Sequence, residues 1–347
     1  MDKIRFGVVG TNFITDWVIA GAREDSRFEL SAVCSRTLER GREYAQKHNI
    51  LHILTSLEQM ATSDKVDAID IASPNYMHAE QSILAMSHGK HVLCEKPMAS
   101  NAKEVRQMIE ASNRYGVALM EAMKSTLSPN FLAVRDNLER IGKPRRYFAS
   151  FCQYSSRYDK FKEGIVLNAF KPELSNGAMM DIGVYTIYPM VALFGKPNTI
   201  NAQGIVLSSG ADGQGAVNME YEGMNATVLY SKIANSHLQS EIEGEEGNIL
   251  IDKIQTPTTV RFIARSAPAS GKEVRSEGEL LSREDTHNEY YYEIKEFIDL
   301  ILEGRTESEI NSHETSLSTI ELIDEVRRQL GVKYPADEAK ATNCNYS

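Results

Sequence analysis

Short apolar runs alternate with longer amphipathic segments over the first 120 residues, and this alternation constrains the fold more than any other feature of the sequence. The runs are rich in β-branched residues and lie at residues 4–9, 28–34, 51–54, 66–72, 91–94 and 117–120. Helical periodicity lies between them at residues 38–48, 77–88 and 102–115. Parallel strands joined by crossover helices produce this pattern. The sequence therefore predicts an α/β fold with a doubly wound parallel sheet, whose ligands bind beyond the carboxyl ends of the strands.

The pattern changes after about residue 122. A helical stretch over residues 129–140 runs into Gly142 and Pro144, which end helices. Alternating segments then follow, separated by Gly, Asn and Ser, at residues 146–153, 216–221, 226–233 and 248–251. We expect a loose turn over residues 204–215, a hairpin tip over residues 267–278, and two closing helices at residues 289–303 and 313–330. This second half is therefore predicted to hold a largely antiparallel sheet.

Composition narrows the class of partner. Acidic residues outnumber basic ones by 48 to 38, which gives a net charge of −10, and no clustered basic run suggests a nucleic-acid site. No apolar run approaches the roughly 18 residues of a membrane helix, and no secretory signal is evident. The four cysteines are widely spaced and form no zinc or disulfide pattern. We expect a soluble, cytoplasmic protein that binds neither nucleic acid nor membrane.

The first predicted strand ends in a partial dinucleotide-binding motif. A GxGxxG fingerprint would place glycines at Gly10, Asn12 and Thr15, and the sequence keeps the first. Asn12 tolerates a positive φ, and its side chain and that of Thr11 can donate to phosphate oxygens. The alternative is a plain strand-to-helix turn in which Asn12 caps the helix. The residues alone leave the two interpretations about evenly balanced.

The end of the second strand indicates which dinucleotide would bind. An acidic residue there would bind the ribose 2′-hydroxyl of NAD, but the sequence has Ser35, Arg36 and Thr37, with Arg40 one turn later. A hydroxyl beside guanidinium groups attracts a 2′-phosphate. We therefore predict NADP(H) as the preferred cofactor, with NAD(H) possible. In the alternative, Ser35 or Thr37 caps the next helix and Arg36 is a solvated charge.

Four further motifs occur in a characteristic order. They are P-N-x-x-H at residues 74–78, G-K-H-V-L-x-E-K-P at residues 89–97, G-A-M-M-D-I-G-V-Y at residues 177–185 and E-F-I-D at residues 296–299. With these motifs the chain resembles, nearly from end to end, the Gfo/Idh/MocA family of nicotinamide-dependent oxidoreductases. Having Tyr185 where some members have His places it nearer to the dihydrodiol dehydrogenase and glucose-fructose oxidoreductase branches.

The resemblance implies a fold and a set of site residues. Residues 1–122 would form a Rossmann dinucleotide-binding domain, and residues 123–347 a substrate-binding and oligomerisation α/β domain with a large, mostly antiparallel open sheet. That sheet often packs against a partner subunit, so a homodimer or tetramer is expected. The implied catalytic residues are Lys96, Asp181 and Tyr185. The expected cofactor-binding residues are Gly10, Thr11, Asn12, Phe13, Ile14, Ser35, Arg36, Arg40, Ser73, Pro74, Asn75, His78, Glu95 and Lys96.

The chemistry of these catalytic residues is consistent with hydride transfer at a carbinol carbon, which also moves a proton and so needs an acid or base. A free tyrosine with a pKa of ~10 is a poor base at neutral pH. We expect the Lys96 ammonium to lower the pKa of Tyr185 and to stabilise alkoxide charge. Asp181 would lie on the same helical face as Tyr185. In the alternative without a catalytic role, Lys96 is a solvated charge, Asp181 marks the start of a helix and Tyr185 is a packed ring. No metal is expected.

Other residues carry weaker signals. Glu121 is either a site residue or a solvated acid, Tyr290, Tyr291 and Tyr292 read mainly as helix packing, and Tyr154, Arg157 and Tyr158 are weak candidates for substrate contact. The sequence predicts an NADP(H)-dependent oxidoreductase of a secondary alcohol or carbonyl in a sugar, polyol or cyclic diol. The alternatives are a nicotinamide-dependent glycosidase-type relative and a non-catalytic nucleotide sensor.

Overall fold

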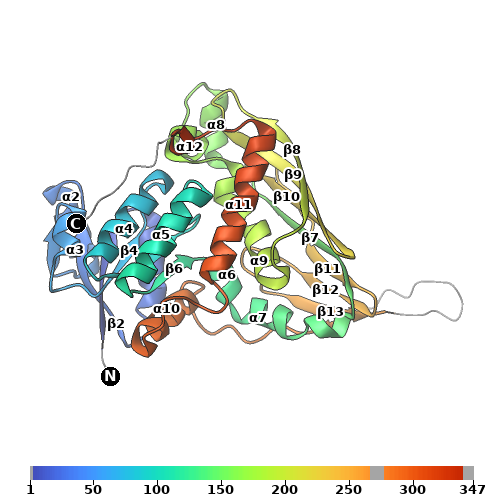
Figure 1. Cartoon of the computed structure of the whole chain (residues 1–347), viewed down its shortest axis with the longest axis horizontal. Helices are drawn as coiled ribbons and strands as arrows, with labels where there is room; N and C mark the ends of the chain where they lie inside the picture. Colours follow the sequence, from blue (N-terminus) through green and yellow to red (C-terminus); the bar gives the residue numbers. More distant parts are fainter. Residues whose placement is uncertain (1–2, 266–276, 339–347) are drawn as a thin grey trace, which may run out of the picture.

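The computed structural model describes residues 3–265 and 277–338. In this part of the chain the predicted parallel sheet is confirmed, with strand order β3-β2-β1-β4-β5-β6 and parallel pairing throughout (Figure 1). Its strands are β1 (Ile4–Val9), β2 (Phe28–Cys34), β3 (His52–Leu54), β4 (Ala68–Ile71), β5 (His91–Glu95) and β6 (Leu119–Ala122). The order reverses between β1 and β4, which is where doubly wound folds bind ligands.

Helices cover both faces of this sheet. The crossover helices are α1 (Phe13–Ala22), α2 (Leu38–His48), α3 (Leu57–Ala61), α4 (His78–Ser87) and α5 (Ala102–Tyr115). Side-chain oxygens of Asn12, Thr37, Ser56 and Asn101 accept hydrogen bonds from the first turns of α1, α2, α3 and α5. These caps satisfy backbone N–H groups that a helix leaves unpaired. The caps of α1 and α2 follow closely on β1 and β2, so both helices begin at the ligand-binding edge.

The predicted large, mostly antiparallel second sheet is also confirmed. Within the described residues its order is β14-β13-β12-β11-β7-β10-β9-β8, and all neighbours are antiparallel except β7 and β10. The strands are β7 (Pro144–Cys152), β8 (Thr199–Val206), β9 (Asp212–Tyr221), β10 (Met224–Ser231), β11 (Ser240–Gly244), β12 (Gly247–Ile251), β13 (Val260–Ala264) and β14 (Glu279–Leu280).

Two sequence expectations about loops need comment. The loose turn predicted over residues 204–215 is wrong for most of its length, because β8 continues to Val206 and β9 starts at Asp212. Backbone pairing across this hairpin outweighs the local glycines, and Gly204 pairs directly with Gly215. Most of the hairpin tip predicted over residues 267–278 lies outside the described residues.

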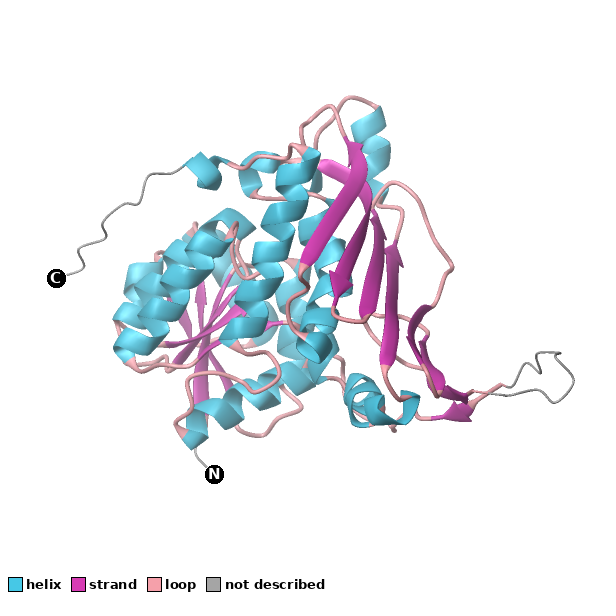
Figure 2. Ribbon diagram, turned by 45° about the vertical axis from the view of Figure 1, so that its right-hand side comes forward, coloured by secondary structure: helices cyan, strands magenta, loops and turns pink. Residues whose placement is uncertain are grey.

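The remaining helices follow the first sheet along the chain. They are α6 (Lys124–Leu127), α7 (Pro129–Asp136), α8 (Ser156–Lys162), α9 (Val184–Phe194), α10 (Tyr291–Glu303), α11 (His313–Leu330) and α12 (Pro335–Glu338). Figures 1 and 2 show α11 between the layers, where it contacts α5 on one side and α9 and β8 on the other. Helix α10 packs against α1 and so returns to the first sheet. Helices α10 and α11 thus connect the two sheets.

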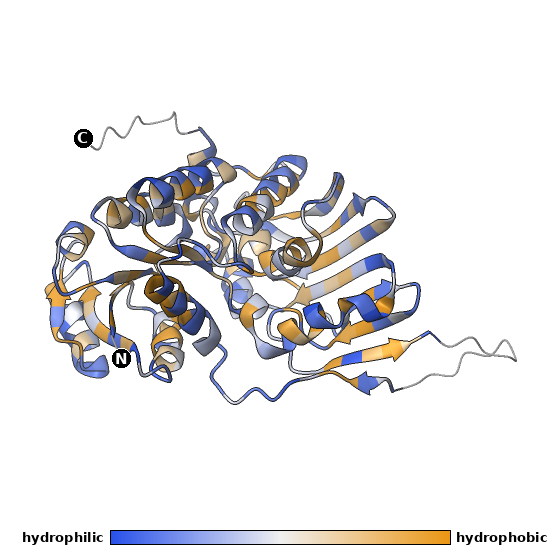
Figure 3. Cartoon of the chain, turned by 60° about the horizontal axis from the view of Figure 1, so that its bottom comes forward, coloured by the Kyte–Doolittle hydropathy of each residue, from blue (hydrophilic) through white to orange (hydrophobic). Residues whose placement is uncertain are grey.

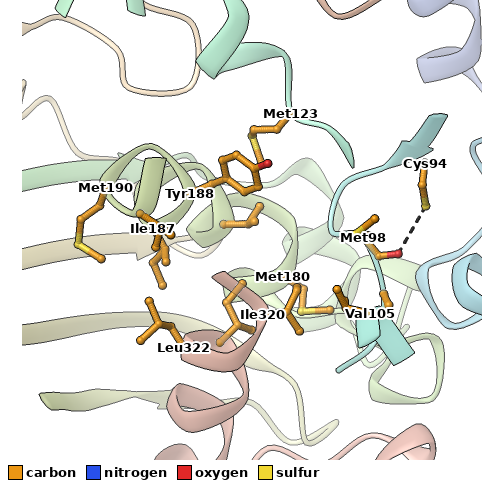
Figure 4. Packing of buried hydrophobic residues seen from close by; sticks show 14 of the residues in the cluster. Cys94, Met98, Val105, Met123, Met180, Ile187, Tyr188, Met190, Ile320 and Leu322 are labelled. Atoms are coloured by element: carbon orange, nitrogen blue, oxygen red, sulfur yellow. Dashed lines mark hydrogen bonds between the residues drawn. The ribbon is translucent and has the colours of Figure 1, made fainter. Parts of the chain in front are cut away.

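A shared apolar core reinforces this arrangement. Figure 4 shows Met98, just after β5, close to Met180 and Ile320, and these residues belong to one buried cluster that includes parts of both sheets. The thiol of Cys94 donates to the carbonyl oxygen of Met98 at 3.4 Å. Figure 3 shows hydrophobic colour along the strands and mixed faces on the helices, as expected for amphipathic helices on a buried sheet. The segment after β5 is therefore held by packing on both sides.

Within the described chain, every helix is too short or too polar to cross a lipid bilayer.

Candidate active site

Two adjoining cavities lie beyond the carboxyl ends of the parallel strands. The first has a volume of about 700 Å³ and is lined by eight of the predicted cofactor-binding residues: Gly10, Thr11, Asn12, Ser35, Arg36, Arg40, Ser73 and Pro74. The second, of about 310 Å³, reaches Asp181 and is lined by the other six: Phe13, Ile14, Asn75, His78, Glu95 and Lys96. Asn12 and Asn168 line both cavities. All fourteen residues therefore lie in one continuous region.

The turn after β1 differs from the sequence expectation. Asn12 has φ −97°, so the positive φ considered for it is wrong, and its side chain caps α1 by accepting from the N–H groups of Ile14 (2.8 Å) and Thr15 (3.2 Å). The left-handed backbone falls on Gly10 at φ +117°, where an added Cβ would lie 2.6 Å from the carbonyl oxygen of Ala72. Only glycine fits this close approach. The N-cap Asn12 lines both cavities, and the first residues of α1, Phe13 and Ile14, line the second, so the N-terminus of the helix, which favours anions, lies where the two cavities adjoin.

The far end of the first cavity carries positive charge. Arg36 and Arg40 are exposed, Ser35 is buried, and Thr37 caps α2 as the alternative interpretation proposed. Arg40 donates to the carbonyl oxygen of Thr11 at 3.3 Å and so ties α2 to the turn after β1. No Asp or Glu is among the described residues that line this cavity. Two guanidinium groups without a carboxylate suit a dinucleotide with a ribose 2′-phosphate.

Asn75 and His78 hold the loop after β4 in place. The amide of Asn75 donates to the carbonyl oxygen of Ser175 and to the side chain of Asn176, both at 2.9 Å. The buried ring of His78 lies 3.0 Å from the carbonyl oxygen of Pro97 and 2.9 Å from that of Ser73. These contacts join the loops after β4 and β5 to the segment before α9. The two residues therefore shape the second cavity as well as line it.

Lys96, Asp181 and Tyr185 converge at the second cavity. Lys96 directly follows β5, Asp181 lies in a π-helical turn (Met179–Gly183), and Tyr185 lies in the first turn of α9. The Lys96 ammonium donates to the main-chain oxygen of Asp181 at 2.9 Å, lies 3.3 Å from its Oδ1 atom and 4.8 Å from the centre of the Tyr185 ring. Such π-helical turns occur frequently at functional sites. Lys96 and Asp181 line the cavity, and the partly exposed Tyr185 lies beside them.

The charges at this site act differently on the two acids. Partial removal from water would raise the pKa of Asp181, but the positive charges of Lys96 and Lys232 outweigh it and hold the pKa well below its usual value. Burial raises the pKa of Tyr185 well above its usual value, and the negative charges of Glu95 and Glu293 add to the effect. The expectation that Lys96 lowers the pKa of Tyr185 is therefore wrong. The phenol is protonated and the carboxylate is ionised.

Lys232 is a site residue that the sequence analysis missed. It follows β10, its side chain is 4% exposed, and its ammonium contacts the Oδ2 atom of Asp181. A lysine at the end of an alternating strand belongs to no motif in the sequence and usually reaches solvent. The only available signal was its place at the carboxyl end of a strand, which requires the topology of the second sheet to interpret.

Glu121 on β6 is fully buried, so the solvated-acid interpretation is wrong. Its Oε1 atom accepts a hydrogen bond from the backbone N–H of Met98 at 2.9 Å, and burial raises its pKa to about 7. It is not among the residues that line either cavity. Glu121 therefore holds the backbone of the segment that follows Lys96 through its hydrogen bond with Met98.

The remaining candidates divide into a cavity residue and packing residues. Arg157 on α8 lines the second cavity, whereas Tyr154 donates to Asp159 at 2.7 Å and Tyr158 stacks on Phe161. The tyrosines at the start of α10 pack as expected: Tyr290 is buried, and Tyr291 stacks on His287 at 3.9 Å. Of these candidates, Arg157 is thus the one that lines a cavity.

Comparison with protein families gives two adjoining matches. Residues 4–123 match the oxidoreductase family with the NAD-binding Rossmann fold, and residues 131–250 match the GFO/IDH/MocA C-terminal domain.

Individual relatives match over nearly the whole chain. Scyllo-inositol 2-dehydrogenase (NADP(+)) IolU of Bacillus subtilis is 50% identical, over 97% of this chain and 100% of the relative. Trans-1,2-dihydrobenzene-1,2-diol dehydrogenase of Xenopus laevis is 30% identical, over 95% of this chain and 99% of the relative. The solved structure of levoglucosan dehydrogenase with NADH and levoglucosan has the same fold, with a TM-score of 0.82 at 18% identity, covering 95% of this chain and 98% of that one.

Proposed function

The chain belongs to the Gfo/Idh/MocA oxidoreductase family, and from this premise we propose that it is an NADP(H)-dependent oxidoreductase of a secondary alcohol or carbonyl in a polyol or sugar. The observation that carries the proposal is the convergence of Lys96, Asp181 and Tyr185 next to a cavity with the size and charge for a dinucleotide. Inositols are the first substrate class, because the relative at 50% identity is a scyllo-inositol dehydrogenase.

NADP(H) is the proposed cofactor, with NAD(H) as the second choice. Arg36, Arg40 and the buried Ser35 line the far end of the first cavity, where a 2′-phosphate would lie. The Bacillus subtilis relative is named as an NADP(+) enzyme. When bound, the nicotinamide supplies or accepts the hydride of the reaction. The chain's own residues must then bind the substrate oxygen and move one proton.

Lys96 and Tyr185 are proposed to perform these two tasks. The Lys96 ammonium lines the second cavity and would polarise a carbonyl oxygen or stabilise an alkoxide. The high pKa of Tyr185 keeps its phenol protonated, so a proton is available for the alkoxide that forms when a carbonyl is reduced. In the oxidising direction the phenol must first release its proton to solvent, and the phenolate can then accept the proton of the substrate hydroxyl, so oxidation gains from higher pH. Asp181 is ionised and would orient the substrate hydroxyl or Lys96.

The proposal extends to the organisation of the chain. We propose residues 1–122 as the cofactor domain and residues 123–347 as the domain for substrate and oligomerisation. The second sheet would pair with another copy of the chain in a homodimer or tetramer. The protein would act in the cytoplasm, without nucleic-acid or membrane partners. In support, Cys34, Cys94 and Cys152 are unpaired thiols, and the net charge is −10.

A substrate screen tests the proposal. The protein is mixed with NADP⁺ or NAD⁺ and with scyllo-inositol, myo-inositol, trans-dihydrodiols and aldoses, and absorbance is followed at the reduced-nicotinamide band. We expect reduction of NADP⁺ by at least one inositol, with a lower kcat/KM for NAD⁺. A parallel Lys96→Ala sample controls for contaminating dehydrogenases. Binding of cofactor without its reduction by any of these compounds would contradict the proposal and favour a nucleotide sensor or a glycoside-cleaving enzyme.

A further inference from the structure

Lys232 is a buried cation whose place in the site calls for an explanation. Its side chain is 4% exposed, and it is not among the residues that line either cavity. Its ammonium contacts the Oδ2 atom of Asp181 and lies 5.8 Å from the centre of the Phe170 ring. Burying an ammonium is costly unless a partner offsets the loss of water. Lys232 is therefore paired with Asp181 and does not face the cavity that Lys96 lines.

Asp181 is shared between two ammonium groups. Lys96 lies 3.3 Å from its Oδ1 atom, whereas Lys232 occupies its Oδ2 atom. The backbone of Lys232 is fixed as well, since its N–H donates to the carbonyl oxygen of Gly213 at 2.9 Å and its own carbonyl oxygen accepts from Ser155 at 2.9 Å. Of the two lysines, only Lys96 faces the cavity. The two cations thus have different freedom to move.

We infer that Lys232 is a positioning residue that holds and charge-compensates the Asp181 carboxylate, so that the Lys96 ammonium can turn from Asp181 to the substrate oxygen. This inference rests on the proposed function. If Lys96 were the only cation near Asp181, turning away would leave a half-buried carboxylate, with its side chain 36% exposed, without a charged partner, which is unfavourable. With Lys232 in place, the carboxylate keeps a charged partner throughout the reaction.

The groups around Asp181 define what removing Lys232 would change. Lys96 and Lys232 face its two oxygens, Tyr185 lies next to Lys96, and Glu95 and Arg157 line the same cavity. Without Lys232, the effect of burial on Asp181 is opposed by Lys96 alone, so the carboxyl takes up a proton at a higher pH. A protonated Asp181 no longer needs a cation, so the loss of Lys232 matters less as the pH falls.

The kinetic test compares Lys232→Met with Lys232→Arg. We expect Lys232→Met to lower kcat about tenfold or more, to leave the KM for NADPH within about twofold, and to add an acid limb to the pH profile of kcat/KM. Lys232→Arg should restore most of kcat and remove the limb. The matched control is Lys253→Met, at an exposed lysine after β12. Near-normal turnover in Lys232→Met would overturn the inference. So would a loss of turnover that Lys232→Arg does not restore and that adds no acid limb to the pH profile.

A double-mutant cycle with Asp181→Asn separates positioning from general support of the fold. Once Asp181 is neutral, Lys232→Met should change kcat by less than about twofold. An equal loss in both backgrounds would show that Lys232 acts independently of Asp181. The double variant removes Asp181 and Lys232 together, so neither is left without the other, and the test stays available even if Lys232→Met alone does not fold.

A measurement without substrate keeps this inference distinct from the proposed function. The Tm of Lys232→Met should lie below that of the wild type at pH 8, and the deficit should shrink as the pH falls to 5, because Asp181 becomes protonated. With Asn at position 181, the deficit should not vary with pH. A deficit that is constant in the Asp181 background would overturn the inference, whereas a wild type that oxidises no polyol would overturn only the proposed function.

Discussion

The ammonium of Lys96 lies 4.8 Å from the centre of the Tyr185 ring. One residue follows a strand of the parallel sheet and the other starts a helix that packs beneath the antiparallel sheet. The ammonium faces the aromatic ring, an arrangement stabilised by cation–π attraction, and does not bond to the phenol oxygen. Lys96 and Tyr185 are therefore placed to act on one substrate oxygen, while the phenol keeps its proton.

Replacing Lys96 by alanine should lower kcat by about 10²-fold or more, because it removes the charge that stabilises the substrate oxygen. The fold should persist, since Asp181 keeps Lys232 as a charged partner. Steady-state kinetics measures the loss, and NADPH fluorescence measures cofactor binding, which should stay within a few fold. Lys65→Ala, at an exposed lysine, is the matched control. A Lys96→Ala enzyme with wild-type kcat would remove this residue from the mechanism.

Tyr185→Phe should lower kcat by about 10²-fold while preserving the ring contacts with Lys96 and Phe151. Because burial raises the pKa of Tyr185, carbonyl reduction by the wild type should show no alkaline limb from this phenol up to about pH 10. Rates of carbonyl reduction across the pH range check both statements. Near-normal turnover of the variant would transfer the proton donor's role to water, and a lower-pH limb that vanishes in the variant would contradict the raised pKa.

Arg36→Ala should weaken the binding of NADPH about tenfold and that of NADH less than twofold. A guanidinium contact to the 2′-phosphate is a charge-assisted hydrogen bond, and NADH lacks this phosphate. Titration calorimetry with both cofactors gives the two affinities. Arg42→Ala is the control, since Arg42 is exposed on α2, the helix that follows Arg36, and is not among the residues that line the cavity. Equal weakening for both cofactors would count against recognition of the phosphate.

Glu121→Gln tests the buried acid under the segment that follows Lys96. The pKa of Glu121 is raised from its usual value near 4.5 to about 7, so the folded state holds its proton more tightly than the unfolded state. The stability that this proton contributes is complete below about pH 4.5 and is lost as the pH rises through 7. Between pH 4.5 and 8, the unfolding free energy of the wild type should fall by about 3 kcal/mol relative to Glu121→Gln.

Urea unfolding at several pH values measures this difference, and glutamine keeps an acceptor for the N–H of Met98. The control is Glu139→Gln at an exposed position, which should parallel the wild type. Parallel pH dependence of the wild type and Glu121→Gln would show that Glu121 does not titrate differently on folding.

Sequence analysis predicted the parts of the molecule that depend on local pattern. The alternation of apolar runs and amphipathic segments predicted the parallel sheet, and the ordered motifs identified the family and the loops that carry Lys96 and Asp181. The second sheet was predicted from period-two segments, although the extents of β8 and β9 were not. Hairpin pairing determines such ends, and local composition does not reveal it.

Properties that arise from three-dimensional packing could not be predicted. The caps at Asn12 and Thr37 follow from their own turn chemistry and were foreseen as alternatives. Lys232 reaches Asp181 because β10 packs against the π-helical turn at Met179–Gly183, and no motif encodes that contact. The pKa of Tyr185 was also predicted in the wrong direction. We expected Lys96 to lower it, whereas burial and the neighbouring acids raise it.

The most direct test of the central claim follows an isotope. Scyllo-inositol with deuterium on its ring carbons is incubated with the protein and NADP⁺, and the nicotinamide product is examined by mass spectrometry and NMR. Our account predicts one deuterium at C4 of the reduced nicotinamide for each ketone formed, and none in the Lys96→Ala control beyond its residual turnover. Deuterium found in water, or retained in the substrate while a reduced cofactor without label accumulates, would contradict it.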